Sequence, residues 1–143
     1  MGATRADATT VLAFDFGEKR IGVAVGDLGL RLAHPLTTVH AQGSVRQLAA
    51  VEALVKEWNP VLLVVGLPSH PDGAEHEMSR AARRFAARLQ SRFGIEAALV
   101  DERYTSASAE EALRAAGARR RKAALDPVAA QHILQAFFDE RAA

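Results

Sequence analysis

One short stretch near the N-terminus constrains the fold more than any other part of the chain. Val11–Phe14 are four apolar residues in a row, which is typical of a strand covered on both faces. The chain then passes Asp15 and Gly17, where a turn leads into a second apolar run, Ile21–Val25. Asp15 is therefore predicted at the exit of a central strand. An isolated charge there costs several kcal/mol of folding free energy unless it is paired. A divalent cation is a partner that would also give the carboxylate a function as a metal ligand.

Length, charge and cysteine content limit the possible classes of protein. The 143 residues are enough for one domain, of which residues 1–9 are expected to be disordered. The formal net charge is only +1, so only local clusters of charge can indicate a partner. Cysteine is absent, which excludes disulfides, thiolate nucleophiles and cysteine-based zinc sites. Since no stretch resembles a signal peptide or a membrane span, we expect a cytoplasmic protein without membrane contact.

Short apolar strands alternate with amphipathic helices along the chain. Strands are predicted at Val11–Phe14, Ile21–Val25, Leu32–Val39, Val61–Val65 and Ile95–Val100. Helices are predicted at Val45–Trp58, Glu77–Arg92, Ala107–Ala116 and Pro127–Glu140. Ser44 is the expected N-cap of the first helix, and Pro35 favours an edge position for the third strand. The order of elements predicts an α/β fold with a mixed sheet and helices on its faces.

Acidic residues occur at the ends of three predicted elements. Asp15 follows the first strand, the pair Asp101 and Glu102 follows the fifth, and Asp126 precedes the last helix. Ligands of such sheets collect beyond the carboxyl ends of the strands, so these side chains could converge. Oxygen ligands suit Mg²⁺ or Mn²⁺ and disfavour zinc. The pattern therefore favours phosphoryl chemistry.

Each of these acidic residues has an alternative interpretation. Asp15 could merely close the turn with its side chain, although a turn aspartate is usually exposed and does not follow four core residues. Alternation along a strand directs Asp101 and Glu102 to opposite faces, so only one of them can face the site. The residues alone do not decide between the two. Asp126 followed by Pro127 also fits a helix cap and the first helical residue. Asp126 could therefore be a metal ligand, a cap or both.

Basic residues form two groups that could contact phosphate. Arginines recur at every fourth position from Arg80 to Arg92, and this stripe is either a solvated helix face or a phosphate-binding surface. The segment from Arg119 to Lys122 is expected to be a loop beside the acidic site, either a phosphate-binding arm or an ordinary surface loop. The candidate nucleic-acid contacts are Lys19, Arg20, Arg103, Tyr104, Arg119, Arg120, Arg121 and Lys122.

Five ordered motifs over nearly the whole chain resemble the YqgF/RuvX family. The motifs are Ala13–Gly17 with Gly22–Ala24, Val65–Pro68, Asp72-Gly73, Asp101–Arg103 and Asp126–Leu134. The resemblance implies a ribonuclease H-like fold, with a mixed five-stranded sheet and helices on both faces, related to the RuvC-type Holliday junction resolvases. It maps the acidic residues of the family onto Asp15, Glu102 and Asp126, with Asp101 as the alternate metal ligand.

The resemblance also implies a function. The expected activity is metal-dependent hydrolysis of RNA phosphodiesters during maturation of the 5′ end of pre-16S ribosomal RNA, with two Mg²⁺ or Mn²⁺ ions. RNA and pre-ribosomal particles are the expected partners. One alternative is a junction resolvase acting on structured DNA, which would require a homodimer rather than a monomer. The other is a non-catalytic nucleic-acid-binding module in ribosome assembly or regulation.

Overall fold

The structure, a computed structural model, describes residues 9–67, 75–101 and 121–142, with side chains described in these ranges except at 75–76, 121–126 and 142. Three strands come first and are followed by strands that alternate with helices. The elements are β1 (Thr10–Asp15), β2 (Arg20–Asp27), β3 (Leu32–His40), α1 (Ser44–Trp58), β4 (Leu62–Leu67), α2 (Glu75–Phe93), β5 (Ala97–Asp101) and α4 (Arg121–Ala142).

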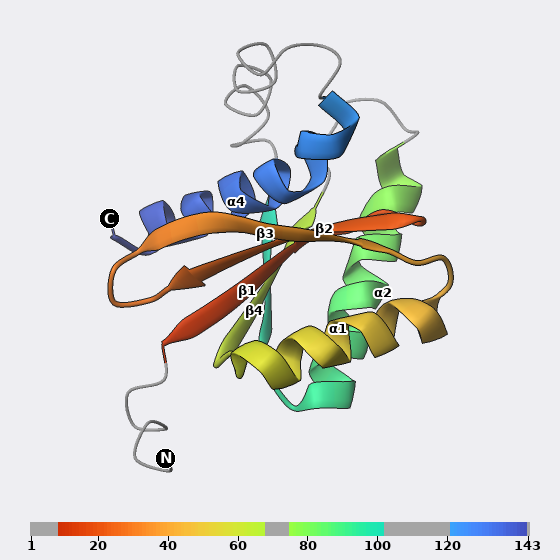
Figure 1. Ribbon diagram of the computed structural model, residues 1–143, viewed down its shortest axis with the longest axis horizontal. Coiled ribbons are helices and arrows are strands. Elements are labelled where there is room, and N and C mark those ends of the chain that lie inside the picture. Colours follow the sequence, from red (N-terminus) through yellow and green to blue (C-terminus); the bar gives the residue numbers. More distant parts are fainter. Residues whose placement is uncertain (1–8, 68–74, 102–120, 143) are drawn as a thin grey trace.

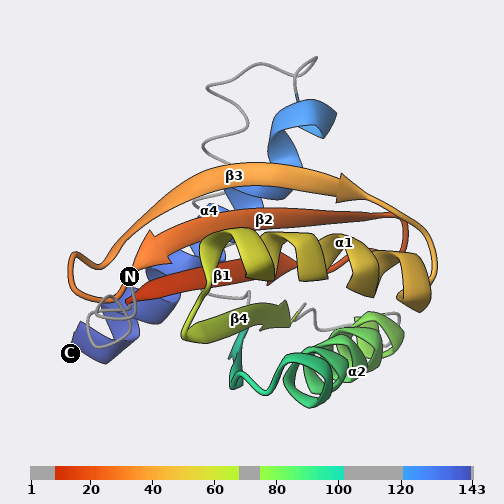
Figure 2. The ribbon, with the colours of Figure 1, turned by 60° about the horizontal axis from the view of Figure 1, so that its bottom comes forward.

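The strands form one sheet in the order β3-β2-β1-β4-β5. β1, β2 and β3 are antiparallel neighbours, whereas β4 runs parallel to both β1 and β5. The parallel connections need crossovers, and α1 and α2 supply them. Figures 1 and 2 show α1 and α2 on one face of the sheet and α4 on the other. The carboxyl ends of β1, β4 and β5 therefore lie at one edge of a three-layer molecule.

Alternate residues of β1 belong to two separate cores. Leu12 and Phe14 pack on the face covered by α1 and α2, where Phe85 meets Phe14 edge to face at 5.8 Å between ring centres. Val11 and Ala13 pack on the opposite face against buried residues of α4. All four of these β1 residues are fully buried. The first strand is thus covered on both faces, as its continuous apolar run predicts.

Polar side chains fix α4 across the edge strand β3. Gln131 donates from Nε2 to the carbonyl oxygen of Ala33 at 3.0 Å, and Gln135 accepts from the backbone N–H of Ala33 at 3.2 Å. Gln135 also donates to the carbonyl oxygen of Arg31 at 3.0 Å. These bonds occupy backbone groups that an edge strand would otherwise expose. They hold α4 in a fixed register over β2 and β3.

The mixed five-stranded sheet with helices on both faces is confirmed. Each strand and the first two helices lie within two residues of their predicted bounds. Pro35 lies in edge strand β3 as predicted, where the register with β2 shifts between Val23 and Ala24. A proline has no N–H to donate, and an edge strand with a local irregularity accommodates it.

Two predictions about helix ends are wrong. Gly43, and not Ser44, is the N-cap of α1, and no side chain caps this helix. The last helix begins at Arg121, six residues before the predicted start, so Asp126 and Pro127 lie inside it. Asp126 is therefore not a cap, and Arg121 and Lys122 are helical rather than part of a loop. Figure 1 shows α4 changing direction near its light-blue beginning, which a proline inside a helix explains.

Other predictions concern residues outside the described ranges. The expected helix over Ala107–Ala116 lies outside them, as do residues 1–8 of the segment expected to be disordered. Thr9, the last residue of that segment, is described. Its hydroxyl donates to the Asp27 carboxylate, and its carbonyl oxygen accepts from Leu28 N–H at 2.9 Å. Thr9 is thus tied to the end of β2.

Candidate functional site

Asp15 is the last residue of β1 and lies half-buried at the carboxyl edge of the sheet. Its strand has Val11 and Ala13 on the α4 face. By alternation, Asp15 belongs to that same face. The buried residues of β1 therefore place the Asp15 carboxylate at the point where the strand emerges from the hydrophobic core.

Asp15 is flanked by a glycine on each neighbouring strand. Gly22 is its register partner on β2. On the other side, Val65 of β4 is level with Phe14, so Gly66 follows at the level of Asp15. Neither glycine places a side chain next to the carboxylate. A carboxylate is a hard oxygen ligand, which fits a divalent cation such as Mg²⁺ or Mn²⁺.

Asp101 occupies the same edge of the sheet but a different face. It is the last residue of β5 and is level with Leu67 of β4. Val100 belongs to the core beneath α4, so Asp101 falls on the face of α1 and α2 by alternation. Asp15 and Asp101 are therefore on opposite faces, which argues against Asp101 as the alternate ligand.

The structure does not describe the other two predicted ligands. Glu102 lies outside the described residues, and Asp126 is described only as part of α4. α4 packs on the face to which Asp15 belongs. Among the described side chains, no group of three or more His, Asp or Glu residues could hold a metal ion. The convergence of Asp15, Glu102 and Asp126 therefore stays a prediction.

The predicted nucleic-acid contacts are only partly covered. Lys19 is exposed in the turn between β1 and β2, and Arg20 is the half-buried first residue of β2. Arg121 and Lys122 lie in the first turn of α4, without described side chains. The remaining candidates lie outside the described residues, and they are Arg103, Tyr104, Arg119 and Arg120.

Gln47 is a residue of this site that the sequence reasoning missed. It is only 3% exposed, the one buried polar or charged side chain in the described part of the chain. Its Nε2 donates to the carbonyl oxygens of Gly17 at 3.0 Å and Glu18 at 3.1 Å. The available signal was its spacing, because Gln47 precedes buried Val51 by one helical turn. Gln47 thus holds the turn that directly follows Asp15.

Gly17 makes the same turn possible by a close approach. A Cβ atom at this position would lie 2.4 Å from the carbonyl oxygen of Arg20. Backbone Ala41 N–H also donates to the carbonyl oxygen of Lys19 at 3.1 Å, which ties the turn to the segment after β3. The turn is therefore fixed from both sides.

No helix within the described ranges is long and apolar enough to cross a membrane.

The fold is ribonuclease H-like: a mixed five-stranded sheet with an aspartate at the end of its central strand. Solved structures of resolvases are similar to it. The RuvC structure of T. thermophilus with a Holliday junction substrate matches with a TM-score of 0.59 and 14% identity, covering 94% of this chain and 96% of that one. The fowlpox virus resolvase with junction DNA matches with a TM-score of 0.57 and 10% identity, covering 92% and 98%.

The chain belongs to the RuvX family. The family profile, described as Holliday junction resolvase, matches residues 9–140. A relative from Nitrosospira multiformis is 58% identical over 97% of this chain and 93% of its own length. A relative from Chromobacterium violaceum is 55% identical over 90% and 96%. Both are named as candidate pre-16S rRNA nucleases. The resemblance seen in the sequence motifs is confirmed.

Proposed function

We propose that this protein is a metal-dependent nuclease that hydrolyses RNA phosphodiesters, with the 5′ end of pre-16S ribosomal RNA as its substrate. The observation that carries the proposal is Asp15 at the carboxyl end of the central strand, with Gly22 and Gly66 beside it. The names of the relatives from Nitrosospira multiformis and Chromobacterium violaceum support the RNA substrate. We place the protein in the cytoplasm, where it would meet pre-ribosomal particles.

The proposed ligands are Asp15, Glu102 and Asp126, and they would hold two Mg²⁺ or Mn²⁺ ions. When bound, these ions supply an activated water and stabilise the leaving oxygen. The described part of the chain holds the Asp15 carboxylate in place for this task. The β1 core fixes Asp15, and the turn held by Gln47 fixes the backbone that follows it.

The second candidate is a DNA endonuclease that acts on junctions. Its support is the fold, which is similar to two resolvase structures that contain junction substrates. Resolution of a junction needs two sites related by symmetry, and therefore a homodimer. A monomer that cuts a single RNA strand needs only one site.

Cleavage of matched substrates tests the proposal. Single-stranded RNA carrying the pre-16S 5′ region, DNA of the same sequence and a four-way DNA junction are incubated with Mg²⁺ or Mn²⁺. We expect the RNA to be cut faster than either DNA. Cutting of the junction alone, by a dimer, would replace the proposal with the resolvase function. Binding of RNA without cutting of any substrate would favour the non-catalytic module.

A further inference from the structure

A groove of about 380 Å³ lies on the α1 and α2 side of the sheet, next to the turn that follows Asp15. Asp15, the one proposed metal ligand whose side chain is described, is not among the residues that line it. Its walls come from the β1–β2 turn, the start of α1 and one face of α2. The residues that matter here are Phe16, Glu18, Gly43, Ser44, Arg84 and Arg88, and we call this space the Arg84 groove.

Arg84 and Arg88 bring two positive charges to the same wall. They are four residues apart, so they lie on the same face of α2, about 6 Å from each other along its axis. Both side chains are exposed. Among the described residues, neither arginine forms a salt bridge with an acidic side chain. Their donors therefore line the groove without an ion-pair partner among the described residues.

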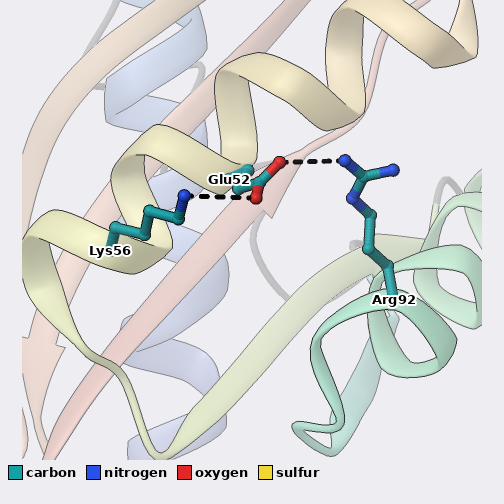
Figure 3. A network of polar contacts seen from close by, with 3 residues as sticks. All are labelled: Glu52, Lys56 and Arg92. Carbon is teal, nitrogen blue, oxygen red and sulfur yellow. Dashed lines mark hydrogen bonds and ion pairs between the residues drawn. The ribbon is translucent and has the colours of Figure 1, made fainter.

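Arg92, the next arginine of the stripe, has a different role. It donates from Nη2 to Glu52 of α1 at 2.9 Å, and Lys56 contacts the same carboxylate at 3.4 Å (Figure 3). These contacts lower the pKa of Glu52, chiefly through the hydrogen bond from Arg92. Within the stripe, Arg92 thus links two helices, whereas Arg84 and Arg88 line the groove and Arg80 lines an adjoining cavity.

The wall opposite α2 is also favourable for an anion. α1 begins at Gly43 without a side-chain cap and has no acidic residue in its first turn. The N–H groups at a helix start carry partial positive charge, which adds to the field of the two arginines. Glu18 is the one acidic residue among the described residues that line the groove, so Arg84 and Arg88 outnumber it there.

The adjoining cavity of about 330 Å³ is different in charge. Glu18 and Glu77 line it together with Arg80 and Arg84, so acidic and basic side chains are equal in number among its described lining residues. The excess of positive charge is therefore in the Arg84 groove, next to the start of α1, and not in the adjoining cavity.

We propose that the Arg84 groove binds the sugar–phosphate backbone of the substrate strand. This inference rests on the proposed function and adds a contact outside the metal centre. Guanidinium groups spaced by one helical turn can each donate to a phosphate of one strand. Phosphate contacts position a strand without reading its sequence. Phe16, which follows Asp15 in the chain, lines the groove, so a strand held there crosses the α1 and α2 face next to the turn that follows Asp15 at the carboxyl edge of the sheet.

A binding titration in the absence of divalent metal tests this proposal separately from cleavage. Fluorescent single-stranded RNA is titrated with protein in EDTA at several salt concentrations, and anisotropy gives the affinity. Replacing both arginines, by Arg84→Gln with Arg88→Gln, should lower the salt slope of log K by about 1.4, since each phosphate contact on a single strand contributes roughly 0.7. DNA of the same sequence should show the same decrease, because the contact is to the backbone.

Arg83→Gln is the matched control. Arg83 is exposed on the same helix but lines neither cavity, so this variant should keep the wild-type slope. Arg84→Lys with Arg88→Lys keeps both charges and should keep most of the slope. Melting curves verify that the variants fold.

Three results would overturn the proposal: an unchanged slope in the double glutamine variant, an equal decrease in Arg83→Gln, or no binding of either strand by the wild-type protein. Failure of the proposed function gives a different result. In that case the strand binds with the expected change in slope, and no substrate is cut with Mg²⁺ or Mn²⁺.

Discussion

The side-chain amide of Gln47 donates to the carbonyl oxygen of Gly17 at 3.0 Å and thereby joins α1 to the turn after Asp15. The same nitrogen lies 3.1 Å from the carbonyl oxygens of Glu18 and Ala41. Three backbone acceptors from two loops thus converge on one buried side chain. The helix that connects β3 to β4 therefore also sets the conformation of the backbone at the candidate site.

Replacement of Gln47 by leucine should cost both stability and activity. Leucine fills similar space but leaves the carbonyl oxygens of Gly17 and Glu18 without this donor, at a cost of about 1–3 kcal/mol. Urea denaturation measures the free energy of unfolding. Arg46→Leu, at the exposed neighbouring position, should change it by no more than about 0.5 kcal/mol. Equal stability of the two variants would show that the amide contacts contribute little.

Gly17→Ala tests the close approach in the same turn. The added Cβ would lie 2.4 Å from backbone oxygen of Arg20, so the turn must shift. We expect a loss of roughly 1–3 kcal/mol in stability and a decrease in cleavage. Gly29→Ala is the control, because its Cβ would meet only a side-chain oxygen of Asp27, at 3.1 Å. A Gly17→Ala protein as stable and active as Gly29→Ala would disprove the steric argument.

Substitutions of Asp126 separate a role in the site from a role in the helix. Because Asp126 lies inside α4, alanine should not weaken the helix and could stabilise it by up to about 0.7 kcal/mol. If Asp126 is a metal ligand, both Asp126→Ala and Asp126→Asn lose cleavage while they remain folded. Cleavage rates and melting temperatures of the two variants measure this. Wild-type cleavage by either variant would remove Asp126 from the site.

His132 should make the protein less stable in acid. Burial in α4 lowers its pKa from the ordinary value of 6.5, so the unfolded chain takes up a proton more readily than the folded chain. Stability is therefore full above the unfolded pKa and falls as the pH decreases from about 7 to about 5. Thermal unfolding of His132→Gln should show a smaller decrease over this range. The same decrease in both proteins would assign it to other groups.

The sequence predicted the sheet well because its signals are local. Apolar runs such as Val11–Phe14 mark strands buried on both faces, and Pro35 marks an edge. The predicted start of α4 was wrong because Asp126 followed by Pro127 is typical of a helix cap and its first helical residue. In the structure the helix begins earlier and continues through both residues. Propensity near a proline is only a preference, and the surrounding structure can override it.

The candidate site was only partly predictable. Asp15 was identified from a charge at the end of an apolar run, and the structure adds its face and its neighbouring glycines. Asp101 and Glu102 could not be separated from sequence alone, because strand parity needs the packing of Val100 beneath α4 as a reference. Gln47 was missed because its partners are backbone carbonyls distant in sequence, which no side-chain pattern reveals.

Asp15→Asn tests the central claim most directly. Cleavage of the pre-16S RNA substrate is measured with Mg²⁺ or Mn²⁺ and with EDTA, alongside Asp139→Asn, an exposed position on α4, as the control. We expect cleavage only with metal, wild-type rates for the control, and a loss beyond a hundredfold for a folded Asp15→Asn protein, equivalent to about 2.7 kcal/mol of transition-state stabilisation. Full cleavage in EDTA, or by Asp15→Asn, would contradict a metal-dependent nuclease centred on this residue.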